Sequence, residues 1–186
     1  MNEKRSLIID VSTTLFGKFG FHAVGVNKII EMSNSSKASL YGNFASKEKL
    51  AEIVLLKRDH DFRLSLNELM RRKRTPLTKI RAVFDWYLDR YENHDFHGCI
   101  FIKAGEQFSN SESNIRKIIQ GHKQWLSETL KELLKLCGVR TPSDLAEYIV
   151  VILDGLSVRV NMFNSKPKAL VNKAWSRVEF LITNKL

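Results

Sequence analysis

The residues whose types could support catalysis or metal binding are few and are not spaced for it. The chain has two cysteines, Cys99 and Cys137, too few for a disulfide framework and without the paired spacing of a zinc site. His94 and His97 beside Asp95 could bind a metal, although a loop with two histidines is more commonly just a loop. No phosphate-binding loop, nucleophile elbow or dinucleotide-binding glycine pattern occurs. We therefore predict no catalytic residue, no metal and no cofactor.

Hydrogen-bonding side chains suited to a different chemistry gather within residues 20–50. Apolar residues at helical spacing give the first part of this segment a buried face: Val26, Ile29 and Ile30. Residues 33–35 predict a tight turn, with Asn34 in the left-handed conformation that Asn tolerates, and Ser36 can cap a second helix. A helix, a short turn and a second helix form the helix-turn-helix layout, whose second helix enters the major groove of DNA.

The charge balance favours a polyanionic partner. The chain has 30 Lys and Arg against 20 Asp and Glu, a net charge of +10, which suits nucleic acid or an anionic membrane surface. Residues 1–75 hold 14 basic and 8 acidic residues, and residues 76–186 hold 16 and 12, so the N-terminal part is more basic per residue. On charge alone, a well-solvated basic surface explains this equally well. The four cations at 71–74 are more typical of a helix end than of a DNA site.

The elements that must position these residues are predicted to be helices throughout. Apolar residues recur at helical spacing nearly everywhere, and no alternating strand pattern is found. Each of the three prolines, Pro76, Pro142 and Pro167, suits the first turn of a helix. Ser46 is the expected N-cap of a long helix over 46–74. We predict an all-α fold of about nine helices and no sheet.

The ends of several other helices follow from local signals. Gly20 is expected to end the first helix, and Cys137-Gly138 a helix over 113–136. Three more helices are expected, over 76–93, 142–163 and 167–184, and a loop at 94–98 leads into the apolar residues 99–102. The apolar run 148–153 is far shorter than the roughly 20 residues of a membrane helix, and the N-terminus lacks a signal-peptide pattern. We therefore expect a cytoplasmic protein with no membrane partner.

A set of residues in the first 50 positions forms a longer pattern. Its members are Leu15-Phe16, Gly20-Phe21, Val26, Ile29, Ser36-Lys37, Leu40-Tyr41, Phe44 and Ser46-Lys47-Glu48-x-Leu50. This pattern resembles the N-terminal domain of the tetracycline-repressor (TetR) family of bacterial transcriptional regulators, and the rest of the chain agrees only in general character. The resemblance implies a three-helix helix-turn-helix DNA-binding domain at 1–50. The long helix would link it to a ligand-binding and dimerisation domain at 75–186.

The sequence departs from the family pattern on the side that would read bases. Val24 stands where a capping Thr is usual, which removes a cap. Asn34-Ser35 replaces Gly-Val, Ala38-Ser39 replaces Gly-Thr, and Gly42-Asn43 replaces an aromatic or histidine pair. The resemblance therefore does not extend to the operator sequence.

The resemblance implies DNA contacts for a group of polar residues. Tyr41 and Lys47 would contact phosphates, Lys47 aided by a helix N-terminus, although Tyr41 could instead be a core aromatic. Lys37, Ser39 and Asn43 would reach base edges, since Lys suits guanine and Asn suits adenine. The full set of DNA-binding candidates is Lys28, Ser36, Lys37, Ser39, Tyr41, Asn43 and Lys47. Leu40 and Phe44 are expected in the core.

The C-terminal part supplies aromatic and polar side chains for a ligand chamber. The candidate pocket residues are Phe84, Tyr87, Tyr91, Cys99, Phe101, Glu106, His122 and Trp125, and about half of these are expected to be ordinary core. Residues 98–106 resemble a Gly-Cys-Leu-Phe stretch that lies near the ligand chamber in a branch of the family. Cys99 could sense electrophiles or oxidants, but a buried, inert thiol is the commoner case.

The predicted function is a ligand-responsive DNA-binding regulator and not an enzyme. Family resemblance implies a homodimer through helices 142–163 and 167–184. Asp154 and Arg159 lie in that apolar face and would each be paired across or within it, because an unpaired buried charge is costly. We expect a repressor that a small molecule releases from a palindromic operator. The alternatives are a helical protein that binds another polyanion or partner, and a helical enzyme without a known motif. The sequence specifies neither the effector nor the operator, nor whether the protein represses or activates.

Overall fold

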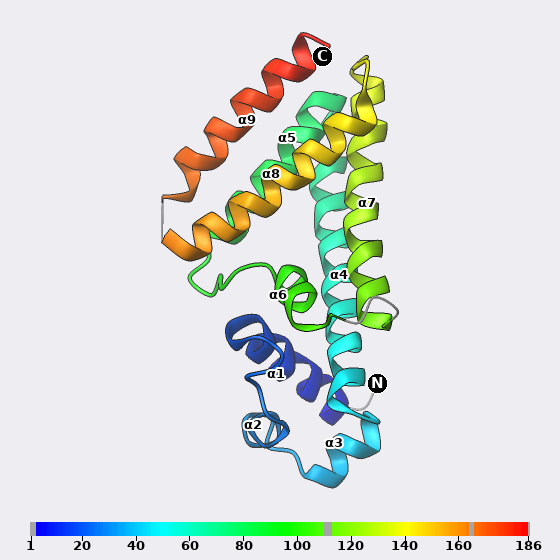
Figure 1. Ribbon diagram of the computed structural model, residues 1–186, viewed down its shortest axis with the longest axis vertical. Coiled ribbons are helices and arrows are strands. Elements are labelled where there is room, and N and C mark those ends of the chain that lie inside the picture. The colour runs from blue at the N-terminus through cyan, green and yellow to red at the C-terminus, as the bar shows by residue number, and fades with distance from the viewer. Residues whose placement is uncertain (1–2, 110–112, 164–165, 186) are drawn as a thin grey trace. The chain divides into compact units, whose positions relative to one another are not determined.

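A computed structural model describes residues 3–109, 113–163 and 166–185 of the chain, and within these ranges it contains only α-helices (Figure 1). The predicted all-α fold is thereby confirmed. The helices are α1 (Glu3–Phe19), α2 (Val26–Met32), α3 (Lys37–Asn43), α4 (Lys47–Arg71), α5 (Pro76–Glu92), α6 (Ile100–Gln107), α7 (Asn114–Leu136), α8 (Pro142–Phe163) and α9 (Pro167–Thr183). None of these helices has the length and apolarity needed to span a membrane.

The helices pack into two compact units, each made from separate stretches of sequence. The first unit is Met1–Asp61 with His97–Gln120, and the second is Phe62–Phe96 with Gly121–Leu186. Two of the three boundaries fall inside long helices, α4 and α7, and the third falls in the loop between α5 and α6. By packing, therefore, α6 belongs with α1 to α3. The division expected from the sequence, at residues 50 and 75, concerns function and stays a prediction.

The core of the first unit joins α1, α2 and α3, and α6 contributes to it. Phe16 and Phe21 stack with their ring centroids 4.7 Å apart, and both are fully buried. Leu40 and Phe44 are buried in the same core, as predicted. The apolar residues that α6 adds to this core are Ile100, Phe101 and Ala104. Burial of these side chains is the main source of stability for the unit.

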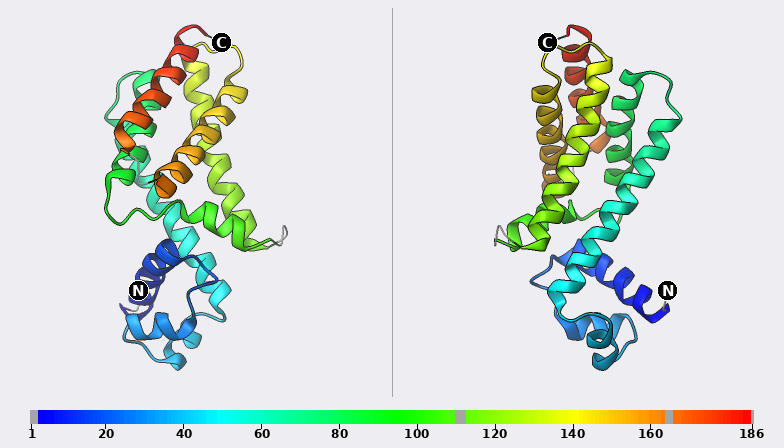
Figure 2. Two further views of the ribbon diagram at one scale, coloured as in Figure 1. Left: turned by 60° about the vertical axis from the view of Figure 1, so that its left-hand side comes forward. Right: turned by 90° about the vertical axis from the view of Figure 1, so that its right-hand side faces the viewer.

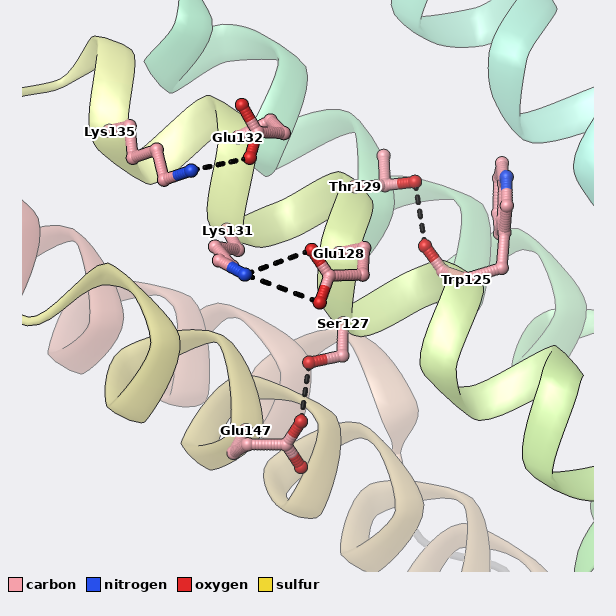
Figure 3. Close-up of polar contacts among 8 residues, drawn as sticks. All are labelled: Trp125, Ser127, Glu128, Thr129, Lys131, Glu132, Lys135 and Glu147. Carbon is pink, nitrogen blue, oxygen red and sulfur yellow. Dashed lines mark hydrogen bonds and ion pairs between the residues drawn. The ribbon is translucent and has the colours of Figure 1, made fainter.

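The second unit is built from α5, α8 and α9 packed on one another, together with the adjoining parts of α4 and α7 (Figures 1 and 2). Inside it, the Tyr91 hydroxyl donates to the carbonyl of Leu153 at 3.1 Å and lies 2.9 Å from the Ser157 hydroxyl. These buried polar groups satisfy one another. Between α7 and α8, the Ser127 hydroxyl donates to Glu147 (Figure 3).

Local signals set most helix ends where the sequence predicted them. Pro76, Pro142 and Pro167 are each the first residue of a helix. Gly20 (φ +83°) follows α1 and Gly138 (φ +77°) follows α7, both in the left-handed region that glycine adopts easily.

One predicted helix end was wrong: α4 stops at Arg71 rather than at residue 74. The amide of Lys73 donates to the carbonyl of Met70, which tightens the last turn. Thr75 then has an extended backbone (φ −108°, ψ 153°), and its hydroxyl caps α5 by accepting from the amide of Thr78 at 3.2 Å. Since a residue before proline avoids the helical region, the chain must leave α4 before Pro76.

Candidate nucleic-acid interface

The turn between α2 and α3 has the geometry that the sequence predicted. Asn34 has φ +46°, the left-handed conformation expected for it. The buried Ser33 hydroxyl donates to the carbonyl of Ile29 at 2.7 Å, and the amide of Ser35 donates to the carbonyl of Ile30 at 3.0 Å. These bonds close the end of α2, so the turn is fixed before α3 begins.

The N-terminus of α3 is capped by Ser36, also as predicted. Its hydroxyl accepts from the amide of Ser39 at 3.0 Å. Leu40 faces the core, whereas Lys37 and Tyr41 are exposed, with 45% of Tyr41 accessible to solvent. Tyr41 is therefore not a core aromatic. The exposed side of α3 presents an ammonium group and a phenol, both suited to DNA.

Asn43 and Ser39 are less accessible than Lys37. Both are half-buried, and the Asn43 side-chain amide donates to the carbonyl of Ser39 at 2.8 Å. Within α3, part of the Asn43 amide is therefore already used. A base contact by Asn43 would use its carbonyl oxygen or its second N–H, and neither requires this bond to break.

Two lysines predicted to attract phosphates differ in their surroundings. Lys28 is exposed and pairs with Glu31 at 3.1 Å along α2, which offsets part of its charge. Lys47 is the first residue of α4, where the hydroxyl of Ser46 accepts from the amide of Lys49 at 3.0 Å. Lys47 is half-buried, and burial lowers the pKa of its ammonium group. An anion bound at this helix N-terminus would counter that loss of hydration.

The structure separates the eight candidate ligand-binding residues into two groups. Cys99, Phe101 and Glu106 belong to the first unit, where Phe101 is buried in the same core as Leu40. The others belong to the second unit: Phe84, Tyr87, Tyr91, His122 and Trp125. Phe84 is fully buried against Trp175, with ring centroids 5.3 Å apart, as part of the packing of α5 on α9.

Tyr87, His122 and Trp125 meet around a residue that the sequence did not single out. Phe62 of α4 lies with its ring centroid 4.8 Å from His122, 5.8 Å from Trp125 and 4.7 Å from Trp86, all in edge-to-face geometry. His122 is buried at 2% exposure. We call Phe62, Trp86, Tyr87, His122 and Trp125 the aromatic cluster. No local signal could have found Phe62, because it is one apolar position among many on a long helix.

The cysteines and loop histidines are not gathered into a reactive or metal-binding group. Cys99 and Cys137 are unbonded thiols, both half-buried, and Cys99 is the N-cap of α6. Burial raises the pKa of the Cys137 thiol. Across the described parts of the chain, no three His, Cys, Asp or Glu side chains come together as a metal site would require.

The exposed face of α8 carries apolar side chains in a stripe. Four residues at helical spacing form it: Tyr148, Val151, Val158 and Met162. Asp154, expected to be paired, forms an ion pair with Lys123 of α7. Arg159 is exposed, and its guanidinium lies 5.2 Å from the centroid of the Phe163 ring. A stripe of this kind on one helix is typical of a surface covered by a partner.

Comparison with known proteins bears on the first unit most directly. A family model described as "Bacterial regulatory proteins, tetR family" matches residues 8–54. The HTH-type transcriptional activator FasR of Mycolicibacterium smegmatis is 27% identical over 97 residues, which are 52% of this chain and 44% of that protein. The aligned region thus spans less than half the length of that relative.

Solved structures resemble the chain over nearly its whole length. A TetR-family transcriptional regulator from Streptomyces coelicolor has a TM-score of 0.92 at 23% identity, covering 99% of this chain and 96% of that one. Reduced NemR of Escherichia coli has a TM-score of 0.85 at 18% identity, covering 97% of each chain. At these identities the comparison shows a shared fold.

Proposed function

We propose that this chain is a ligand-responsive repressor of the tetR family of bacterial regulatory proteins, released from a palindromic operator by a small molecule. The observation that carries the proposal is the α2–turn–α3 segment, capped at Ser36 with its Lys37 and Tyr41 side exposed. A recognition helix must be held rigidly while its outer side chains stay accessible to the groove.

We assign DNA-binding roles within this segment and at the start of α4. Lys37, Ser39 and Asn43 read base edges, and Tyr41 and Lys47 contact phosphates. Ser36 holds the start of α3. Lys28 adds sequence-independent attraction that weakens with salt. The N-terminal domain at 1–50 is the DNA-binding domain, and residues 75–186 sense the ligand and dimerise.

The apolar stripe on α8 supports a homodimer. Together with the exposed Phe180 of α9, it leaves large apolar side chains in water that a second copy would bury. A two-fold dimer places two recognition helices on half-sites roughly 34–36 Å apart. This geometry explains why the operator should be palindromic.

The aromatic cluster supports a small-molecule effector, since apolar rings around a few polar groups suit a ligand chamber. Its Phe62 lies on α4, a helix that begins in the first unit and ends in the second. A ligand that favours one position of α4 would change the separation of the two recognition helices in the dimer. The protein acts in the cytoplasm, where its DNA lies.

The Mycolicibacterium relative favours a second candidate function. That protein is a transcriptional activator, so this chain could activate rather than repress. Transcription from a promoter carrying the selected operator separates the two roles: a repressor lowers the transcript level, and an activator raises it.

The test of DNA binding is selection from a pool of random duplexes at moderate salt, with sequencing of the retained fraction. We expect a palindromic motif for the native chain and no motif for a variant with Lys37→Glu and Tyr41→Ala. If the native chain enriches nothing, the basic surface serves another polyanion and the DNA-binding assignment is wrong. An effector that binds without changing operator affinity would contradict the proposed release.

A further inference from the structure

The end of α1 is held by two side chains of α6. The side-chain oxygen of Gln107 accepts from the amides of Phe21 at 2.7 Å and His22 at 2.9 Å. The ammonium group of Lys103 donates to the carbonyl of Gly17 at 2.6 Å and has a longer contact, 3.4 Å, with that of Lys18. Both helices belong to the first unit, although these partners are 85 or 86 residues apart in sequence.

These bonds satisfy groups that a helix end leaves open. The last carbonyls of a helix have no intrahelical partner, and their end of the helix is partially negative. The amide of Gly20 satisfies the carbonyl of Phe16 at 2.9 Å, and Lys103 supplies both a donor and a positive charge for the following carbonyls. Gln107 then binds the first two amides beyond Gly20. The C-cap of α1 is therefore completed from another part of the chain.

The backbone at Gly20 is shaped for this contact. Gly20 has φ +83°, and a Cβ atom placed on it would lie 2.6 Å from the side-chain nitrogen of Gln107. Next to it, Phe108 packs edge-to-face against Phe21 and His22, with ring centroids 5.4 and 5.6 Å away. The close approach of Gln107 to Gly20, two hydrogen bonds from backbone amides and the ring contacts of Phe108 thus all fall on residues 20–22.

Residues 20–22 lie in the short connection between α1 and α2, and α1 packs against both α2 and α3. The point at which α1 ends thus sets where α2 starts. We propose that Gln107 and Lys103 are positioning residues for DNA binding, which cap α1 from α6 and so fix α2 and α3. This inference rests on the proposed function, and it means that the DNA-binding unit needs α6 as well as residues 1–50.

The test compares a substitution at Gln107 that removes the acceptor oxygen with one that keeps it. Gln107→Leu removes the acceptor, Gln107→Glu keeps a side-chain oxygen at the same position, and Gln120→Leu makes the same change at an exposed position of α7 in the same unit. Two quantities are measured: hydrogen exchange of the peptide covering residues 17–25, and affinity for the operator selected by the native chain.

For Gln107→Leu we expect faster exchange of this peptide and about tenfold weaker operator binding, because two hydrogen bonds to the backbone are lost. Gln107→Glu and Gln120→Leu should match the native chain in both measurements. Native exchange and affinity in Gln107→Leu would overturn the inference. Equal losses in the Leu and Glu variants would also overturn it, because the acceptor would then not be the cause.

Two further arms keep the result interpretable. If Gln107→Leu does not fold, Lys103→Met takes its place, and native exchange and operator affinity in that variant would overturn the inference. If the native chain selects no operator, the proposed function fails on its own. Exchange of residues 17–25 then still decides whether Gln107 caps α1.

Discussion

Lys37 is exposed at the first position of α3, so its ammonium group can reach a base edge without displacing another side chain. We expect Lys37→Ala to weaken binding to the selected operator by about 1–3 kcal/mol and to relax specificity at one base pair. The thermal midpoint should not change, because no core contact is lost. Operator titrations at several salt concentrations measure the effect.

The matched control is Lys117→Ala, which removes an exposed lysine from α7 in the same unit. It should leave specificity unchanged. If Lys37→Ala binds the operator like the native chain at every salt concentration, Lys37 does not read a base.

The thiol of Cys137, in the second unit, provides a prediction about pH dependence. Burial raises the pKa of its thiol, so between the ordinary and the raised pKa the folded chain holds less thiolate than the unfolded chain. In a Cys99→Ser variant, alkylation by iodoacetamide should be slower in the folded than in the urea-unfolded chain at pH 8. The pH at which the alkylation rate reaches half of its maximum should also be higher for the folded chain. Equal midpoints in mass-spectrometric rate profiles would show that the thiol is not shielded.

Residue types predicted the inward and outward sides of α3 well. Leu40 and Phe44 are buried and Lys37 is exposed, because a short amphipathic helix has only one side that can face a core. The sequence left the position of Tyr41 open, since a tyrosine suits both a core and a phosphate. It also did not show that the Asn43 amide bonds within its own helix.

Helix ends provide a prediction at the scale of the element. Gly17 lies inside α1, with nothing within 4 Å of a Cβ placed on it, whereas Gly20 has a left-handed φ and meets Gln107. We expect Gly17→Ala to raise the free energy of unfolding by about 0.5–1 kcal/mol, since alanine lowers the entropy lost in a helix. Gly20→Ala should lower it by about 1–3 kcal/mol.

Urea unfolding of the two single variants measures both changes, and each variant serves as the other's control. A Gly20→Ala protein as stable as the native chain would mean that the end of α1 can shift at no cost. The proposed capping of α1 by Gln107 and Lys103 of α6 would then have no geometric basis.

Sequence predicts where helices end better than which helices pack together, because helix ends depend on nearby residues and packing depends on residues far apart in the sequence. Pro76, Ser36 and Gly20 act on their own turn of backbone, so their effects were readable in advance. The apolar residues before Lys103 were predicted as a run after a loop and, for Phe101, as a candidate pocket residue. Their packing in the α1 core depends on pairings across some 85 residues, which no local pattern encodes.

For the whole molecule, the same limit explains why the sequence suggested consecutive domains. Composition and family resemblance divide the chain along its length, whereas packing joins His97–Gln120 to the N-terminal helices. This explains why the candidate ligand residues fall into two groups. They were selected because they lie in the C-terminal part of the sequence, but the fold places some of them with the core of the first unit.

Dimerisation through the apolar stripe on α8 can be tested by a single substitution. Val151 is 66% exposed in the centre of the α8 stripe, so a lysine there has no effect on the core of one chain. In a dimer it would be buried without a partner, at about 3 kcal/mol or more, which weakens association by about a hundredfold. We expect Val151→Lys to sediment as a monomer at concentrations where the native chain is a dimer. It should also bind a palindromic operator far more weakly, because each chain then reads one half-site.

Leu136→Lys, which adds the same charge at a 72% exposed position on α7, should leave both properties unchanged. A Val151→Lys protein that remains a dimer would place the interface elsewhere and require another explanation for the exposed apolar side chains of α8.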